Sequence, residues 1–491
     1  AESFDIAIVG AGITGCAIAR QLARYENSIC VIEAGNDVAL GASKANGGLV
    51  HAGYDPAPGT VKAQVNARGC ELYSQWSSEL GFLFNRTGSM VLGFSADDHS
   101  ALERLMQNGR ANGVPELEIV DPGHIRHLEP RANEQATCAL WCPSTGYVDP
   151  FDVAIACAEN AAANGVTFLR EAPVQAIDTL LGNAPLPVGS RRLSDQPERF
   201  AIHTPKGTVR CRILVNAAGN GAALISHMAG AEEFKLAWRQ GNIAVLDKEP
   251  RALMPLYPVP TPISKGVIVT GTVHGNTVIT ATAALREPGD RDTYAADVET
   301  LLNGARKLVP DLDTRRVVRT FAGGRAVIEG LNDFMIGPSA VLPGMFHAAG
   351  IQSPGVASAP AIAERMDHVL HDTGLDLENA RLEPHAPRAA DLDPVEPSHQ
   401  AELIEHDPAW GASLPMRTVP KRIVQAIHRS PGAVSVEGVN AVRAGMGRCQ
   451  SGFCQSRVVH ILARELGCEP SAVPLEDRGS WIVDGTLKEG R

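Results

Sequence analysis

The 491-residue sequence has no apolar run of about 18 residues or more, the length that a membrane-spanning helix needs. It also has no run rich in lysine and arginine, and its formal net charge is −11. Because nucleic-acid binding depends on neutralising phosphates, this acidic chain is a poor candidate for a nucleic-acid-binding protein. Hydrophobic residues make up 44% and charged residues 20%, which indicates an ordinary globular protein rather than a disordered one.

The ten cysteines lack the spacing of a disulfide framework. The apolar start of the chain also lacks the positively charged segment of a signal peptide, because Glu2 and Asp5 come first and Arg20 interrupts the apolar residues. We therefore expect a cytoplasmic protein with reduced thiols, and we expect any contact with a membrane to be made through a partner.

The start of the chain predicts a strand, a helix and a second strand. Residues 4–9 have the pattern of a short buried strand, residues 14–25 that of a helix, and residues 28–33 that of another strand. Such a βαβ unit implies a parallel sheet with helices packed on it. Further strands are expected at 165–169, 211–215 and 345–349, beside Ala-rich helices at 150–164, 222–229 and 358–371.

Two alternating segments, 266–270 and 276–280, predict antiparallel strands. We therefore expect an α/β fold in which a Rossmann-like dinucleotide-binding domain is interrupted by a β-rich substrate domain. A proline-rich linker and a small helical C-terminal domain would follow. The predicted boundaries are 1–90, 142–230 and 313–380 for the dinucleotide-binding domain, 91–141 and 231–312 for the substrate domain, 381–400 for the linker and 401–491 for the C-terminal domain.

A glycine-rich turn between the first strand and the first helix predicts a dinucleotide site. It reads GAGITG and matches the pattern G-x-G-x-x-G. Gly10 permits the tight turn, Gly12 lets the backbone approach a pyrophosphate, and Gly15 lets the helix pack against the strand. Glu33, at the end of the second strand, would accept hydrogen bonds from the ribose hydroxyls, and the helix N-terminus would attract the phosphates.

Two later segments favour FAD over NAD. Residues 41–53, GASKANGGLVHAG, are rich in glycine and serine and could run along a pyrophosphate toward an isoalloxazine ring. Residues 350–355, GIQSPG, precede another helix, whose N-terminus would stabilise the negative charge of a reduced flavin. The Rossmann-like domain is then an FAD-binding domain.

Over about residues 1–375 the chain resembles the FAD-dependent glycerol-3-phosphate dehydrogenase and L-2-hydroxyglutarate dehydrogenase branch of the D-amino-acid-oxidase-like superfamily. The resemblance rests on motifs in the family's order: GAGITG, Glu33, GASKANGGLVHAGYDPAPGTVKA, VNAAGN, FAGGRA and HAAGIQSPGVASAPAIAE. It implies FAD as the cofactor. It also implies hydride transfer to flavin N5 from a small anionic alcohol, either glycerol 3-phosphate or a 2-hydroxy acid.

The resemblance assigns cofactor contacts to further positions. Residues 43, 44, 47 and 48 would line the flavin and the pyrophosphate, Val174 would meet adenine through its backbone, and residues 218–219 would close over the dinucleotide. Residues 355–356 would contact the pyrimidine end of the ring. The complete predicted set is Gly10, Gly12, Thr14, Gly15, Glu33, Ser43, Lys44, Gly47, Gly48, Val174, Ala218, Gly219, Gly350, Gly355 and Val356.

Three residues are candidates for catalysis. His51 matches the histidine that the family keeps beside the flavin and could take a proton at neutral pH, or it could only bind the flavin and order its loop. Arg325 could hold a carboxylate or phosphate bidentately, although Gly324 replaces the family's larger apolar residue and would loosen the pocket wall. His274 lies on a segment that the family directs toward the active site, or it stabilises a turn. Secondary candidates are Arg239, Arg319 and Tyr257.

The end of the chain resembles the BFD-like [2Fe–2S] module of anaerobic-type glycerol-3-phosphate dehydrogenase large subunits. The matching motifs are RAGMGRCQSGFC and RGSWIV. In related subunits this region supplies two of four thiolates, here Cys449 and Cys454, and an upstream Cys-x-Cys supplies the others. Residues 413–418 read SLPMRT and hold no cysteine. We therefore expect no cluster in the isolated chain unless a partner chain or other ligands complete the site.

The sequence leaves two other functions open. The same fold could oxidise a secondary amine or amino acid, for which no strong base is needed. The chain could also be an FAD-binding electron-transfer or scaffold subunit whose C-terminal domain docks a partner. The electron acceptor, whether oxygen, a quinone or an iron–sulfur protein, is not revealed by the sequence.

Overall fold

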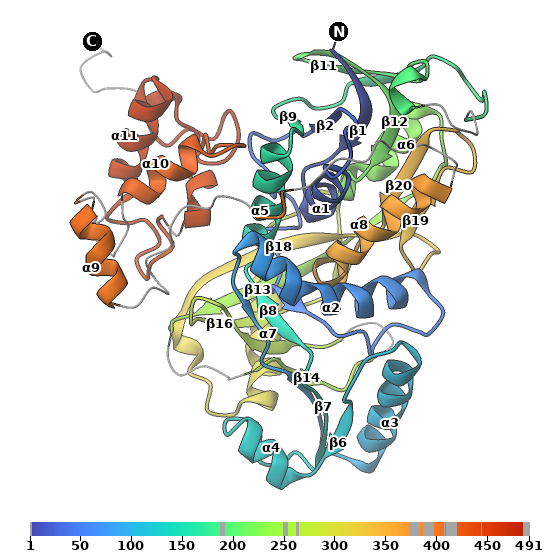
Figure 1. Cartoon of the computed structure of the whole chain (residues 1–491). Coiled ribbons are helices and arrows are strands. Elements are labelled where there is room, and N and C mark those ends of the chain that lie inside the picture. The colour runs from blue at the N-terminus through green and yellow to red at the C-terminus, as the bar shows by residue number, and fades with distance from the viewer. Residues whose placement is uncertain are drawn as a thin grey trace.

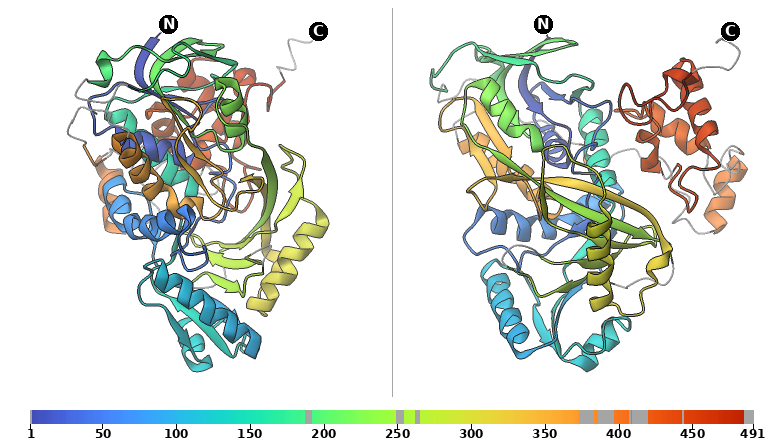
Figure 2. Two further views of the ribbon diagram at one scale, coloured as in Figure 1. Left: turned by 90° about the vertical axis from the view of Figure 1, so that its right-hand side faces the viewer. Right: turned by 180° about the vertical axis from the view of Figure 1, so that it is seen from behind.

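The computed structural model describes residues 2–186, 192–248, 254–261, 265–372, 383–385, 397–406, 408, 420–442 and 444–484. Figures 1 and 2 show one sheet near the N-terminus, a second sheet at the opposite end of the molecule, and the C-terminal helices beside the first sheet. No helix in the described part of the chain has both the length and the hydropathy needed to span a bilayer.

The predicted βαβ unit is present at the start of the chain. It consists of β1 (Glu2–Val9), α1 (Ile13–Leu22) and β2 (Ile29–Ile32). β1 pairs in parallel with β2 on one side and with β12 (Gly207–Asn216) on the other. The parallel sheet that the sequence predicts is therefore confirmed.

Both faces of this first sheet are covered. Along β1, Ile6 and Ile8 belong to one apolar core, which α1, α5 and α8 share. Ala7 and Val9 belong to another core with α6, because successive side chains of a strand point to opposite faces. The remaining elements are α5 (Pro150–Ala163), β9 (Thr167–Leu169), β10 (Ala176–Thr179), η1 (Leu193–Asp195), β11 (Phe200–Thr204), η2 (Gly219–Gly221), α6 (Ala222–Ala229), β19 (Met335–Pro338), β20 (Met345–Ala349) and α8 (Gly355–Asp372).

The second sheet has nine strands, mostly antiparallel, and α3, α4 and α7 pack against it. Its strands β15 and β16 are antiparallel partners, as the segments 266–270 and 276–280 predict. The elements are β5 (Ser89–Gly93), α3 (Ala96–Ala111), β6 (Glu118–Val120), α4 (Pro122–Leu128), β7 (Cys138–Cys142), β13 (Leu236–Leu246), β14 (Leu256–Pro258), β15 (Ile268–Gly271), β16 (Thr277–Thr280), β17 (Ala284–Arg286), α7 (Ala295–Leu308), η3 (Thr314–Arg316) and β18 (Val317–Ile328).

One long strand of the second sheet differs from the predicted domain order. The sequence assigns residues 313–380 to the FAD-binding domain, but β18 pairs with β13 from Leu236↔Ile328 to Leu246↔Val317. The glycines inside β18 hide it from pattern analysis, because glycine is rare within strands. The other predicted boundaries stay predictions.

A small sheet and a long helix lie between the two large sheets (Figure 1). The three strands are β3 (Leu49–Val50), β8 (Gly146–Val148) and β4 (Phe84–Asn85), and the helix α2 (Val61–Leu80) packs against α8. At the start of α2, the Asp333 carboxylate accepts hydrogen bonds from Val61 N at 2.9 Å and Lys62 N at 2.8 Å. These bonds fix the helix start at the boundary between the sheets.

The C-terminal part is helical and has its own core. Its elements are α9 (Pro397–His406), α10 (Pro420–His428), η6 (Gly438–Val442), α11 (Gln455–Leu466) and η7 (Pro470–Ala472). Apolar residues at helical spacing, such as Ile423 and Ile427 in α10 and Leu462 in α11, pack together. Most of the predicted linker 381–400, and all of residues 413–418, lie outside the described residues.

Candidate active site

A cavity of about 910 Å³ is lined by residues from both large sheets. The first sheet contributes the turn after β1 and the segment before β3. The second sheet contributes β13, β16 and β18. The predicted residues that line it are Gly10, Gly12, Thr14, Glu33, Ser43, Gly47, His51, Ala218, Gly219, Arg325, Gly355 and Val356.

The glycine turn forms one wall of the cavity. Gly10 has a φ of +105°, and a Cβ there would lie 2.5 Å from the Ala217 carbonyl oxygen. Gly12 precedes α1, and the Ser43 hydroxyl accepts a hydrogen bond from Ile13 N at 2.8 Å. The glycines therefore bring bare backbone and the positive end of α1 to the cavity, as a pyrophosphate requires.

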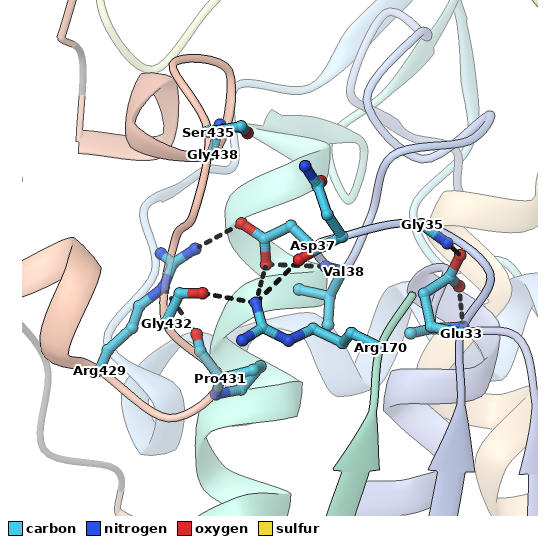
Figure 3. A network of polar contacts seen from close by, with 12 residues as sticks. Glu33, Gly35, Asp37, Val38, Arg170, Arg429, Pro431, Gly432, Ser435 and Gly438 are labelled. Carbon is cyan, nitrogen blue, oxygen red and sulfur yellow. Dashed lines mark hydrogen bonds and ion pairs between the residues drawn. The ribbon is translucent and has the colours of Figure 1, made fainter. Parts of the chain in front are cut away.

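Glu33 lies in the same wall, at the end of β2 (Figure 3). Its carboxylate accepts hydrogen bonds from Ala11 N at 2.7 Å and Gly35 N at 2.8 Å. Burial raises its pKa, although the backbone N–H groups that it accepts from oppose this effect. An oriented carboxylate at this position has lone pairs left for ribose hydroxyls. The turn, the helix end and Glu33 thus fit the adenosine and pyrophosphate of FAD.

Five of the predicted cofactor contacts lie outside the cavity lining: Lys44, described below, and four others. Gly15 packs closely against the Gly10 carbonyl, and Gly48 packs against Val148 of β8. Gly350 packs against a side chain of β18. Val174 contributes to the core around α6. Its backbone contact with adenine stays a prediction.

Lys44 and His274 are also placed away from the cavity lining. Lys44 forms ion pairs with Glu437 and Glu476 of the C-terminal part. His274 lies in the turn between β15 and β16, where its Nε2 is 3.1 Å from the Asp149 carboxylate. Neither side chain lines the cavity, and the cofactor contact of Lys44 and the catalytic role of His274 stay predictions.

His51 lines the cavity, and the Tyr257 hydroxyl lies beside its ring. Its Nδ1 is 3.2 Å from the Tyr257 hydroxyl, and its carbonyl accepts a hydrogen bond from the Asn66 amide at 2.6 Å. Burial, helped by the charge of Lys265, lowers the pKa of His51 well below its usual range. Burial raises the pKa of Tyr257. At neutral pH the imidazole is therefore uncharged and can accept a proton.

Two arginines face the cavity from adjacent strands. Arg239 of β13 and Arg325 of β18 are cross-strand partners. Burial, with the charge of Arg239, lowers the pKa of Arg325 to about 10. Arg325 donates to the Thr282 carbonyl at 3.1 Å, and neither arginine has a carboxylate partner in the described part of the chain. Two unneutralised guanidinium groups on neighbouring strands have the chemistry to hold an anion.

Two lysines that the sequence interpretation missed add to this charge. Lys62 and Lys265 line the cavity. Lys62 donates to the Asn332 carbonyl at 3.2 Å, and Lys265 pairs with Asp55 at 3.0 Å. Burial lowers the pKa of Lys62, and the charge of Lys265 acts in the same direction. Lys62 stands inside the quoted motif GTVKA, but nothing in the sequence marks Lys265.

Two other expectations are changed by the structure. A Cβ on Gly324 would lie 2.2 Å from the Trp238 indole, so this ring occupies the space that the family's larger residue would fill. The pocket wall is therefore not loosened. Arg319 donates to the Gln450 side chain at 3.2 Å and does not line the cavity.

Cys449 and Cys454 lie in the C-terminal part. Cys449 is half-buried, whereas Cys454 is buried in the apolar core just before α11. Across the described ranges, no group of three or more His, Cys, Asp or Glu residues is arranged to hold a metal ion.

Comparison with known proteins also indicates an FAD-dependent oxidoreductase. The family "FAD dependent oxidoreductase" (DAO) matches residues 5–368. A glycerol 3-phosphate dehydrogenase of Caloramator mitchellensis is 35% identical over 492 residues, covering 99% of each chain. The mitochondrial L-2-hydroxyglutarate dehydrogenase of Homo sapiens is 30% identical over 265 residues, covering 53% of this chain and 56% of the relative.

A solved structure with the same fold contains the cofactor. It is a dithionite-reduced L-α-glycerophosphate oxidase from Mycoplasma pneumoniae with FAD bound. The TM-score is 0.73 at 25% sequence identity, covering 79% of this chain and 100% of the other. With a family match over most of its length, this chain belongs to the DAO family of FAD-dependent oxidoreductases.

Proposed function

We propose that this protein is a dehydrogenase that oxidises the secondary alcohol of glycerol 3-phosphate to the ketone. The observation that carries the proposal is that one cavity is lined by the uncharged His51 and by four basic side chains, Arg239, Arg325, Lys62 and Lys265. The glycerol 3-phosphate dehydrogenase that matches along 99% of both chains supports the same substrate.

Oxidation of a secondary alcohol removes a proton from the hydroxyl oxygen and a hydride from the carbon that bears this hydroxyl. When bound, FAD supplies the hydride acceptor, flavin N5. His51 accepts the hydroxyl proton, because its lowered pKa keeps the imidazole uncharged at neutral pH. In the tautomer with the proton on Nδ1, His51 donates a hydrogen bond to the Tyr257 hydroxyl, which orients the ring and leaves Nε2 to accept the substrate proton.

The phosphate of the substrate would bind the arginine pair. A buried arginine without a carboxylate partner is costly, and a bound dianion would neutralise it. Arg325 would grip two phosphate oxygens, and Arg239 would add a second contact from the neighbouring strand. Lys62 would then raise the local concentration of the anion, whereas the charge of Lys265 is paired with Asp55.

The proposal is tested by mixing the FAD-loaded protein anaerobically with single substrates while the visible flavin band is recorded. We expect glycerol 3-phosphate to bleach the band faster than L-2-hydroxyglutarate, glycine or L-proline does. Bleaching by an amino acid but not by glycerol 3-phosphate would show that the bond oxidised is C–N. Bleaching by none of them would instead favour an electron-transfer subunit.

We also propose that the isolated chain carries no [2Fe–2S] cluster. Cys449 and Cys454 provide two ligands of the four that such a cluster needs, and Cys454 is buried among apolar side chains. Electrons would then pass from the flavin to oxygen, a quinone or a partner's centre. Iron and acid-labile sulfide analysis of anaerobically purified protein tests this, and near two irons per chain would refute it.

A further inference from the structure

The C-terminal unit, residues 420–442 and 444–484, packs against the segment that joins β2 to the rest of the cavity wall. We call this segment, residues 34–46, the β2 loop. Several of its residues line the cavity, among them Leu40, Ser43 and Asn46. The C-terminal unit therefore touches a part of the chain that also lines the proposed FAD cavity.

The first anchor is Asp37 of the β2 loop (Figure 3). Its side chain is only 3% exposed and lies between two arginines. One carboxylate oxygen is 3.7 Å from Arg170, which follows β9, and the other is 3.5 Å from Arg429, which follows α10. A Cβ on Gly438 would lie 2.8 Å from the Asp37 carboxylate, so glycine permits the close approach of the C-terminal unit here.

The second anchor is Lys44, at the other end of the β2 loop. Its ammonium lies between the carboxylates of Glu437 and Glu476, the latter at 2.6 Å. Arg291, in the segment between β17 and α7, forms an ion pair with Glu476 at 3.2 Å. Asn36 donates a hydrogen bond to the Glu476 carbonyl. Both carboxylates come from the C-terminal unit, which thus grips the loop at two points.

Two hydrogen bonds connect the β2 loop to the glycine turn and the start of α1. Ala39 N donates to the Ala11 carbonyl at 2.9 Å. Ile13 N, at the start of α1, donates to the Ser43 hydroxyl at 2.8 Å. Ala39 lies two residues from Asp37, and Ser43 is next to Lys44. The anchors therefore lie close to the residues that touch the expected pyrophosphate site.

We propose that the C-terminal unit is an intramolecular brace that holds the β2 loop in its FAD-binding position. Affinity for FAD would then depend on Glu437, Glu476 and Arg429, none of which lines the cavity. The physical reason is preorganisation, because a loop already held in its bound position loses less conformational freedom when the cofactor binds. The unit would serve this purpose without any iron–sulfur cluster.

Charge exchange at the second anchor tests the brace. The full-length variants are Lys44→Glu, Glu437→Lys and the double variant, which keeps one lysine among two glutamates. The dissociation constant for FAD is measured by titrating each apoprotein and following flavin fluorescence. We expect each single variant to bind FAD about tenfold more weakly, and the double variant to recover most of that loss. Arg464→Glu in α11, whose ion-pair partner Glu465 belongs to the same unit, is the control that should leave the constant unchanged.

The two single variants separate the brace from direct contact. If Lys44 itself touched FAD, Lys44→Glu would weaken FAD binding, Glu437→Lys would leave FAD affinity unchanged, and the double variant would not recover the loss. This result would overturn the proposal. Unchanged FAD affinity in Glu437→Lys, with a normal thermal unfolding of the apoprotein, would overturn the proposal. If Lys44→Glu does not fold, Glu437→Gln and Glu476→Gln replace it, with the same readout. Because no substrate is used, the outcome is independent of the proposed reaction.

Discussion

The two ends of the cavity are built differently. The dinucleotide end is made of backbone from residues close together in sequence, Gly10 to Ser43, with one decisive carboxylate, Glu33. The substrate end is made of charged side chains from distant strands, such as Arg239 and Arg325. A site made of backbone groups tolerates many side-chain substitutions, whereas a site made of charged side chains loses a contact with each substitution. The two ends should therefore respond to substitution in different ways.

The largest effect should come from His51. His51→Ala removes the proton acceptor but leaves the turn and Glu33 intact, so flavin reduction by glycerol 3-phosphate should slow by about 10²–10⁴-fold. FAD affinity should stay near that of the unchanged protein. Rapid mixing under anaerobic conditions measures the limiting rate. Tyr257→Phe, which keeps the imidazole, should cost much less. A His51→Ala variant that reduces its flavin at the normal rate would remove His51 from the chemistry.

Next comes the arginine pair. Arg325→Lys keeps the charge but loses the bidentate grip, so KM for glycerol 3-phosphate should rise by roughly 10–150-fold. The limiting rate of flavin reduction should change less than KM does. Arg319→Lys, on the same strand but away from the cavity lining, is the matched control. An unchanged KM in Arg325→Lys would mean that the anion binds elsewhere.

At the dinucleotide end, which otherwise consists of backbone, Glu33 is the one side chain whose substitution should have a large effect. Glu33→Ala removes the acceptor for the ribose hydroxyls and for the hydrogen bonds from Ala11 N in the glycine turn and Gly35 N in the β2 loop. FAD should bind about tenfold or more weakly, while KM for the substrate at saturating FAD should stay nearly constant. Fluorescence titration and steady-state kinetics measure the two quantities. A rise in KM without a loss of FAD affinity would show that Glu33 acts at the substrate end of the cavity and not at the dinucleotide end.

The smallest effect is the response to pH. His51 acts as a base only when uncharged, and its pKa is lowered, so acid should inactivate it only below its ordinary value of about 6.5. Between pH 7.5 and 6.5 the rate of flavin reduction should therefore change by less than about twofold. A loss of rate that begins above pH 6.5 would show that burial does not keep the imidazole uncharged.

The difference between the two ends also explains what sequence alone could predict. GAGITG and Glu33 belong to one short βαβ unit, and their arrangement is local. The register that places Arg239 opposite Arg325 joins strands far apart in the chain, so it required the structure. Lys44 and His274 look like site residues by their motifs, yet their partners Glu476 and Asp149 lie in distant segments that the sequence does not reveal.

One measurement tests the central claim, that a base and an anion site together select a phosphorylated alcohol. Anaerobic flavin reduction is compared for glycerol 3-phosphate and for glycerol, which keeps the alcohol and lacks the phosphate. We predict fast and saturable bleaching by glycerol 3-phosphate and almost none by glycerol at the same concentration. Equal rates with the two compounds would contradict the account.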